Sequence, residues 1–136
     1  MKEFTIKTGK RNEICDITHL VEELVPSSLR EGILFLFTPH TTTGLALNEN
    51  YDPAVKLDFL AKLARLFPKD EPYFTHDEGN SDAHLKAIFT GSSLQLPIRN
   101  GRLALGTWQG IYFCEFDGPR TRKVQLYFQS CNPELP

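Results

Sequence analysis

The sequence lacks any apolar run approaching the ~18–20 residues that a membrane-spanning helix requires. Its start, from Met1 to Lys7, also lacks the uncharged apolar segment of a secretory signal. Neither sign of charge dominates, because 15 basic residues face 17 acidic ones and leave a net charge of −2. Such a chain has no bulk attraction for nucleic acid or anionic lipid. We therefore expect a cytoplasmic protein that has neither nucleic acid nor membrane as a partner.

Cysteine is scarce, and the usual short motifs of enzyme sites are absent. Cys15, Cys114 and Cys131 are far apart, odd in number and in no C-x-x-C arrangement, which favours a reducing compartment. Apolar neighbours favour a buried thiol at Cys114 over a nucleophile. The sequence contains no H-E-x-x-H, EF-hand loop, Cys/His finger, P-loop or G-x-G-x-x-G. Nucleotide binding through a glycine cradle is therefore disfavoured.

The composition predicts one folded domain over residues 1–136. Hydrophobic residues make up 40% of the chain and charged residues 24%, and the chain contains 10 Phe. A chain of this length hides about 68% of its unfolded surface on folding, which is enough for one core.

Three segments have helical character. Thr18 can cap a helix that carries Leu20, Val21 and Leu24 and breaks near Pro26. We expect Gly32 to end that helical region. Asp52-Pro53 predicts a helix start, and the helix should run to Pro68. A short helix should follow Ser81 or Asp82 and end at Gly91.

The remaining apolar segments have strand character, and short turns separate them. The run 33–37 is apolar without alternation and predicts a central strand buried on both faces. Strand pairs are expected at 3–8 with 13–17 and at 33–37 with 44–50. Asn100-Gly101 predicts a type I′ hairpin, and Asp117-Gly118-Pro119 a second hairpin that joins 111–116 to 121–129. Helices grouped beside such strands indicate an α+β fold with antiparallel sheets.

Three histidines lie where a fold displays side chains: after the central strand, in the loop 68–80 and in the first turn of the short helix. They are His40, His76 and His84, and three imidazoles with an open position are a catalytic arrangement for zinc. Glu49, Asp52 or Asp82 could orient such ligands or act as a base. On spacing alone, three unconnected histidines with local hydrogen bonds are the simpler interpretation.

Basic residues could complete an anion site. Arg120, Arg122 and Lys123 follow the Gly-Pro turn and could bind a phosphate or carboxylate, or could instead protect a strand edge. Lys86 could reach the same cleft as His84. The break at 106–110 contains Trp108, for which a core position is the simpler interpretation, and Gln109, whose amide needs partners.

Several blocks of this chain resemble the YjbQ-like family of small proteins. They are the segment 93–110, which ends in Gly-Thr-Trp-Gln-Gly, and His40-Thr41-Thr42, Asn48-Glu49-Asn50 with Asp52-Pro53, and Ala83-His84-Leu85-Lys86. The resemblance implies a sandwich-like α+β domain with two to three helices that assembles as a homotrimer. It also implies a divalent metal near His40, His76 and His84, and the imidazole ligands favour zinc.

The same resemblance implies a weak thiamine phosphate synthase activity, in which a pyrimidine pyrophosphate is joined to a thiazole phosphate. Glu49, Asp82 and Gln109 would then be catalytic, and Lys86, Trp108, Arg120 and Arg122 would bind the small phosphorylated substrate. Two other hypotheses stay open. One is a non-catalytic, trimeric ligand-binding protein with a structural metal, and the other is a metal-dependent hydrolase of a small phosphate or ester.

Overall fold

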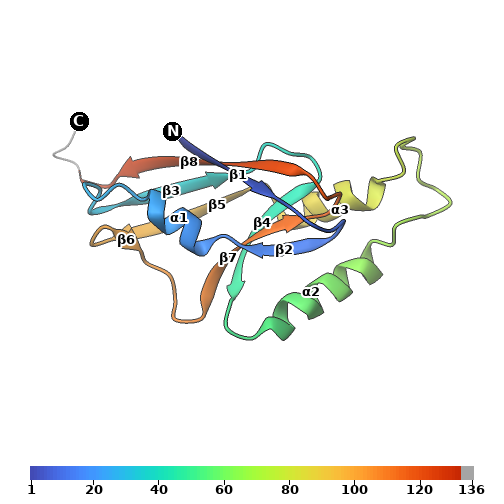
Figure 1. The fold of residues 1–136 in the computed structure, drawn as a ribbon, viewed down its shortest axis with the longest axis horizontal. Helices are drawn as coiled ribbons and strands as arrows, with labels where there is room; N and C mark the ends of the chain where they lie inside the picture. Colours follow the sequence, from blue (N-terminus) through green and yellow to red (C-terminus); the bar gives the residue numbers. More distant parts are fainter. Residues whose placement is uncertain (133–136) are drawn as a thin grey trace.

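The computed structural model describes residues 1–132, which form three helices and eight strands (Figure 1). In chain order they are β1 (Lys2–Lys7), β2 (Glu13–Asp16), α1 (Thr18–Leu24), β3 (Glu31–Phe37), β4 (Thr43–Glu49), α2 (Pro53–Leu66), α3 (Ser81–Thr90), β5 (Ser93–Arg99), β6 (Arg102–Leu103), β7 (Gln109–Glu115) and β8 (Thr121–Ser130).

The strands form two antiparallel sheets. A five-stranded sheet has the order β1-β8-β3-β5-β6, and a three-stranded sheet has the order β2-β7-β4. The main core lies between the two sheets and includes Leu34, Leu36, Leu45, Phe113 and Leu126, all fully buried. This arrangement confirms the predicted α+β fold with antiparallel sheets.

Three of the four predicted strand pairings are wrong, because the connected strands lie in different sheets. β1 pairs with β8 whereas β2 pairs with β7, and β3 and β4 are likewise divided. β7 pairs with β2 and β4, so the turn at 117–119 joins the two sheets and closes no hairpin. The β5–β6 hairpin is confirmed, with positive φ at both Asn100 and Gly101 as a type I′ turn requires.

The helices α2 and α3 cover the face of the three-stranded sheet that points away from the main core. Tyr112, Cys114 and Phe116 of that face pack with Leu63 of α2 and with Ala83 and Ala87 of α3. Cys114 is fully buried, as predicted, and burial raises the pKa of its thiol to about 12.

The local signals for helix ends were mostly correct. Asp52 caps α2 by accepting a hydrogen bond from the Ala54 N–H at 2.9 Å, and Gly91 follows the end of α3. Gly32 is a correction, because it lies within β3, where a Cβ would collide with the Gln129 carbonyl. In residues 1–132 no helix is both long and apolar enough to cross a membrane.

The central strand β3 is buried on one face only. Leu34 and Leu36 are fully buried, whereas Phe35 on the opposite face is half-buried and Phe37 is 37% exposed. The prediction of burial on both faces is therefore wrong for a single chain, because no element of the described chain is packed over this outer face (Figure 1).

Candidate functional site

Three of the connections between the sheets meet at one end of the molecule, beside α3 (Figure 1). They are the segments 8–12, 38–42 and 116–120. Backbone hydrogen bonds tie them together, namely Thr8 N–H to Arg120 O at 2.9 Å, Gly118 N–H to Arg11 O at 3.1 Å and Phe116 N–H to Thr42 O at 3.1 Å. This end therefore presents side chains from parts of the chain that are distant in sequence.

A buried ion pair stands beneath these connections. The Arg122 guanidinium donates to both carboxylate oxygens of Glu115, at 2.8 and 2.5 Å, and also to the Thr42 hydroxyl at 2.8 Å. Glu115 is fully buried and also accepts from the Thr8 hydroxyl at 2.7 Å. Bidentate pairing of this kind fixes the guanidinium plane. Arg122 is thus held rigidly at the wall of the site.

A second buried network holds the start of α3. Asp82 is fully buried and accepts two hydrogen bonds from Arg11, both at 2.9 Å, and one from Lys86 at 3.0 Å. Lys86 also donates to the Asn12 side chain at 3.1 Å. These contacts anchor the helix turn that carries His84 to the segment 8–12.

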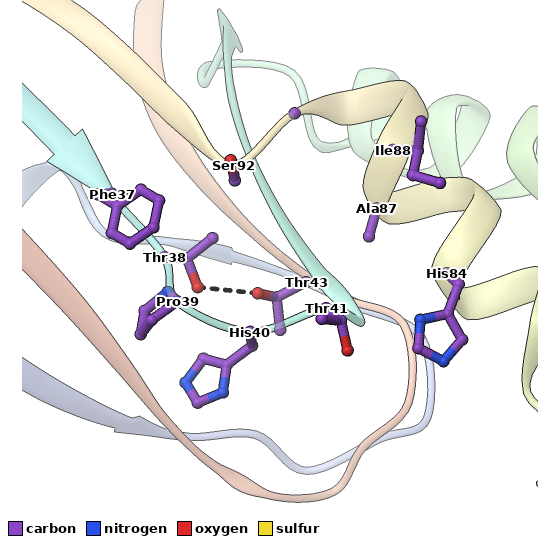
Figure 2. A pocket seen from close by; sticks show the side chains of 11 residues that line it. Phe37, Thr38, Pro39, His40, Thr41, Thr43, His84, Ala87, Ile88 and Ser92 are labelled. Carbon is purple, nitrogen blue, oxygen red and sulfur yellow. Dashed lines mark hydrogen bonds between the residues drawn. The ribbon is translucent and has the colours of Figure 1, made fainter.

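Two adjoining cavities open at this end. The first, of about 280 Å³, is polar, and the second, of about 500 Å³, is mostly apolar and is drawn in Figure 2. Both are lined by Pro39, His40, Thr41 and His84. The polar cavity adds Thr42, Glu78, Asn80, Asp117, Arg120 and Arg122, and the apolar cavity adds Phe37, Thr38, Thr43, Ala87, Ile88, Gly91 and Ser92. His40 and His84 therefore stand where the polar and apolar parts meet.

His76 lies on the outer side of His84. The two imidazole centroids are 5.1 Å apart in an edge-to-face arrangement, and both rings line a third cavity of about 460 Å³ with Tyr73 and Phe74. His76 also lies near Glu78, with 3.8 Å between Nε2 and Oε2.

The described residues of one chain do not bring His40, His76 and His84 together as one set of metal ligands. Within residues 1–132, no group of three or more His, Cys, Asp or Glu side chains is placed to hold a metal ion. His40 Nε2 is occupied, because it accepts a hydrogen bond from the Lys123 N–H at 2.8 Å. Figure 2 shows the His40 and His84 rings on opposite sides of Thr41. The structure pairs His84 with His76 in one place and with His40 in another.

Three predicted site residues lie at the far end of the sheets. Glu49 and Gln109 face each other at the end of the β4–β7 ladder that is opposite to Thr43 and Glu115. Seven residues of strand separate the two ends, which is about 20 Å. Trp108 is beside them, 57% exposed and in edge-to-face contact with Tyr51. Within one chain, Glu49, Trp108 and Gln109 therefore lie apart from the histidines, and Trp108 is exposed and not in the core as the simpler interpretation had it.

Asp82 and Lys86 are close to the histidines but do not open into the cavities. They lie beneath the site but line none of its cavities, and each is satisfied by charged or polar partners inside the protein. Burial alone would raise the pKa of Asp82, but hydrogen bonds from Arg11 and Lys86 hold it below its ordinary value of 3.8. Asp82 therefore stays ionised in its hydrogen bonds to Arg11 and Lys86, and this does not suit it to transfer a proton.

The sequence interpretation missed Glu115 and Thr42. A signal existed for Glu115, since it is the one charged residue in the apolar run 111–116. A charge within such a run indicates a buried partner. Thr42 gives no comparable signal.

Comparison with known proteins agrees with this architecture. The family model described as UPF0047 protein YjbQ-like matches residues 2–131. The chain belongs to this family. The YjbQ-like relative YugU of Bacillus subtilis is 49% identical over 127 residues, which cover 93% of this chain and 96% of YugU. MJ1081 of Methanocaldococcus jannaschii is 48% identical over 125 residues, which cover 91% of this chain and 90% of MJ1081.

Solved structures of the YjbQ-like family have the same fold. A crystal structure of a family protein from Clostridium acetobutylicum superposes with a TM-score of 0.91 at 49% identity, covering 95% of this chain and 100% of that one. A YbjQ-like protein from Sulfolobus solfataricus gives a TM-score of 0.89 at 32% identity, covering 95% of each chain. These matches establish the family and the fold, and they leave the reaction to be inferred from the cleft.

Proposed function

We propose that this chain binds and acts on a small phosphorylated molecule in the two adjoining cavities. The observation that carries the proposal is that the two cavities differ in polarity. The polar cavity is lined by Arg120, Arg122 and two histidines, and it continues into the apolar cavity. A phosphate would occupy the polar part and an apolar body the other. The apolar part, at about 500 Å³, is of the size usual for small-molecule sites.

Arg120 is the residue best placed to meet the phosphate. Its Nε and Nη2 donate to the backbone and side chain of Asp117, at 2.8 and 3.1 Å, whereas no described residue accepts from Nη1. Arg122 also has no described acceptor at Nη1, but it is buried and paired closely with Glu115, whereas the side chain of Arg120 is 56% exposed and pairs less closely with Asp117. Calorimetric titration with inorganic phosphate tests this: Arg120→Met should weaken binding about tenfold, since a charge-assisted hydrogen bond contributes roughly 1.5–3 kcal/mol.

Arg102→Met is a matched control for that titration, because Arg102 is exposed on β6, away from the cleft. Equal binding by wild type and Arg120→Met would contradict the placement of phosphate beside Arg120. No phosphate binding by the wild type would contradict the proposed function itself.

The first reaction to assay is the one implied by the family resemblance, thiamine phosphate synthesis. The thiazole nitrogen attacks the methylene carbon of the pyrimidine pyrophosphate, a C–N bond forms, and the C–O bond breaks with its electron pair leaving on pyrophosphate. The cleft supports this choice because Arg120 in its polar part could donate hydrogen bonds to a departing phosphate group. Purified protein should form product, and Arg120→Met should lower the rate while Arg102→Met should not.

We also propose that zinc binds here, with two histidine ligands from one chain instead of three. His76 and His84 supply two imidazoles in contact, and zinc needs further ligands from solvent, substrate or a second chain. When bound, the ion would supply a Lewis acid for phosphate oxygens. Elemental analysis before and after chelation, in wild type and His84→Ala, tests this. Equal zinc content in the two proteins would contradict ligation by His84.

A non-catalytic binding protein is the second candidate. The observation that favours it is that the two buried carboxylates beneath the cavities are already paired, Asp82 with Arg11 and Glu115 with Arg122. Neither is poised to transfer a proton. Saturable phosphate binding with no turnover of pyrophosphate, phosphomonoester or simple ester substrates would favour this candidate over both the synthase and the hydrolase.

We also propose that the chain works as a cytoplasmic homotrimer. The support is the outer face of the five-stranded sheet, where Phe37 and Tyr127 are 37% and 46% exposed beside the half-buried Ile33 and Phe35. Association would hide this face.

A further inference from the structure

His40 completes the edge of a sheet at the point where β3 ends. The β3–β8 ladder stops at the pair Phe37 and Gln125, so the next hydrogen-bonded pair would place Pro39 opposite Lys123. Proline has no N–H to donate, and the chain turns away toward β4. The His40 imidazole takes the place of the missing carbonyl, since its Nε2 accepts the Lys123 N–H at 2.8 Å.

This hydrogen bond determines which ring nitrogen carries the proton. A ring nitrogen that accepts an N–H must present its lone pair, so the proton of the neutral imidazole lies on Nδ1. Protonation of both nitrogens would break the bond to β8. Burial, together with the positive charge of Arg122, also lowers the pKa of His40, with smaller contributions from Lys123 and Arg120 and an opposing one from Glu115.

The Nδ1–H is left available at the junction of the two cavities. His40 lines both of them, and no residue within 1–132 accepts a hydrogen bond from its Nδ1. With Nε2 occupied and Nδ1 protonated, the ring has no lone pair to offer to a metal ion or to a substrate proton. The fold thus leaves His40 one possible interaction with a ligand, which is to donate a hydrogen bond from Nδ1–H.

We propose that His40 is a fixed, neutral hydrogen-bond donor that binds an oxyanion of the ligand through Nδ1–H, and that it is neither a metal ligand nor a general base. This inference rests on the proposed phosphate cleft and assigns a specificity role within it. It removes His40 from the three histidines that we predicted to bind zinc, and leaves His76 and His84 as the imidazoles with free lone pairs. A neutral donor suits a ligand oxygen beside Arg120 without adding a second positive charge.

Nitrogen-15 NMR tests the tautomer in the intact protein without any variant that must fold. Long-range proton–nitrogen correlations of the histidine rings should show His40 as the neutral Nδ1–H form at pH 7.5, before and after addition of Zn²⁺. Inorganic phosphate should shift its Nδ1 resonance. An Nε2–H form, a charged ring, or displacement of the His40 signals by Zn²⁺ alone would overturn the inference.

Two substitutions separate the role in the sheet from the role in binding. His40→Gln places a carboxamide oxygen where Nε2 lies, so it can still accept from Lys123 but loses the Nδ1 donor. His40→Asn keeps an N–H near the Nδ1 position but cannot reach Lys123. We expect His40→Gln to bind inorganic phosphate about tenfold more weakly with near-normal stability. We expect His40→Asn to bind within about threefold of wild type but to unfold at lower urea.

His19→Gln is the matched control, since His19 is exposed on α1 and paired with Glu23. Wild-type affinity in His40→Gln would overturn the donor role while leaving the phosphate cleft intact. If the wild type binds no phosphate, the cleft and the donor role both fail, although the tautomer remains a separate result of the NMR experiment.

Discussion

Glu115 is a carboxylate inside an otherwise apolar strand, and hydrogen bonds keep it charged there. Burial alone would raise its pKa, but donation from Arg122 and Thr8 outweighs burial and holds the pKa below its ordinary value of 4.5. The consequence for the site is geometric. Arg122 lines the polar cavity, but its guanidinium donates hydrogen bonds to Glu115 and Thr42. It therefore shapes the cavity, and its positive charge is largely balanced by Glu115.

The first prediction concerns this pair. Arg122→Leu should lower the free energy of unfolding by about 3–5 kcal/mol, because it leaves a buried carboxylate without its counter-ion. Adding Glu115→Gln should restore more than half of the loss, since an amide needs no counter-ion. Urea unfolding followed by circular dichroism measures both, with exposed Arg102→Leu as the reference. Equal stability of the single and double variants would show that Glu115 is not charged in the fold.

The second prediction follows from the depressed pKa of Asp82. A carboxyl group with a lower pKa in the folded than in the unfolded state stabilises the fold above its unfolded pKa, and that stability is lost as pH falls. The free energy of unfolding should therefore be steady above about pH 5.5 and fall below about pH 4.5. Asp82→Asn should flatten this fall by up to ~1.4 kcal/mol per pH unit.

Asp58→Asn controls for the loss of a negative charge, because Asp58 is exposed on α2. Unfolding curves measured between pH 3 and 7 in the three proteins supply the comparison. The assignment fails if Asp58→Asn and Asp82→Asn have the same slope.

Individual strands and helices could be predicted from the sequence, but the pairing of the strands could not. Alternation and capping located β5, α2 and α3, because these signals are local. The turns at 9–12, 38–42 and 117–119 look like hairpin turns, but each joins two sheets. A local turn signal fixes where the chain reverses and not which strand it meets next.

The same limit applies to the site. Asp82 and Lys86 are four residues apart on a helix, so their contact could have been predicted. Arg11, which completes the network, is 71 residues away from Asp82 and carries no such signal. The long-range meeting of three inter-sheet connections creates the cavity. Glu49, which we considered as an orienting residue or base for the histidines, lies at the other end of β4.

The third prediction tests how α3 is seated on β4. A Cβ at Gly44 would collide with the Thr90 side chain at the end of α3, so Gly44→Ala must push the helix away. We expect a loss of about 1–3 kcal/mol in stability, as for overpacked cores, with weaker phosphate binding because His84 moves with α3. Gly9→Ala is the control, since its nearest neighbour would be Glu13 Oε2 at 3.8 Å. Equal effects at the two positions would argue against tight seating of α3.

At the scale of the whole molecule, the two faces of the five-stranded sheet differ in a way that one chain does not explain. The inner face packs into the main core, whereas the outer face exposes Tyr127 and Phe37 along two central strands. Aromatic side chains gathered on an open sheet face are typical of an interface. The homotrimer proposed above would cover this face with copies of the same chain.

The fourth prediction is that Tyr127→Lys dissociates the assembly. A lysine there would place an unpaired charge in the contact between copies and would lose aromatic contact area. Light scattering on the wild type should give three times the 15.5 kDa of the chain, and Tyr127→Lys should give 15.5 kDa with an unchanged far-UV spectrum. Leu57→Lys is the matched control, because Leu57 is 65% exposed on α2. If Leu57→Lys dissociates the assembly and Tyr127→Lys does not, the copies meet through α2, and the outer sheet face must serve another purpose.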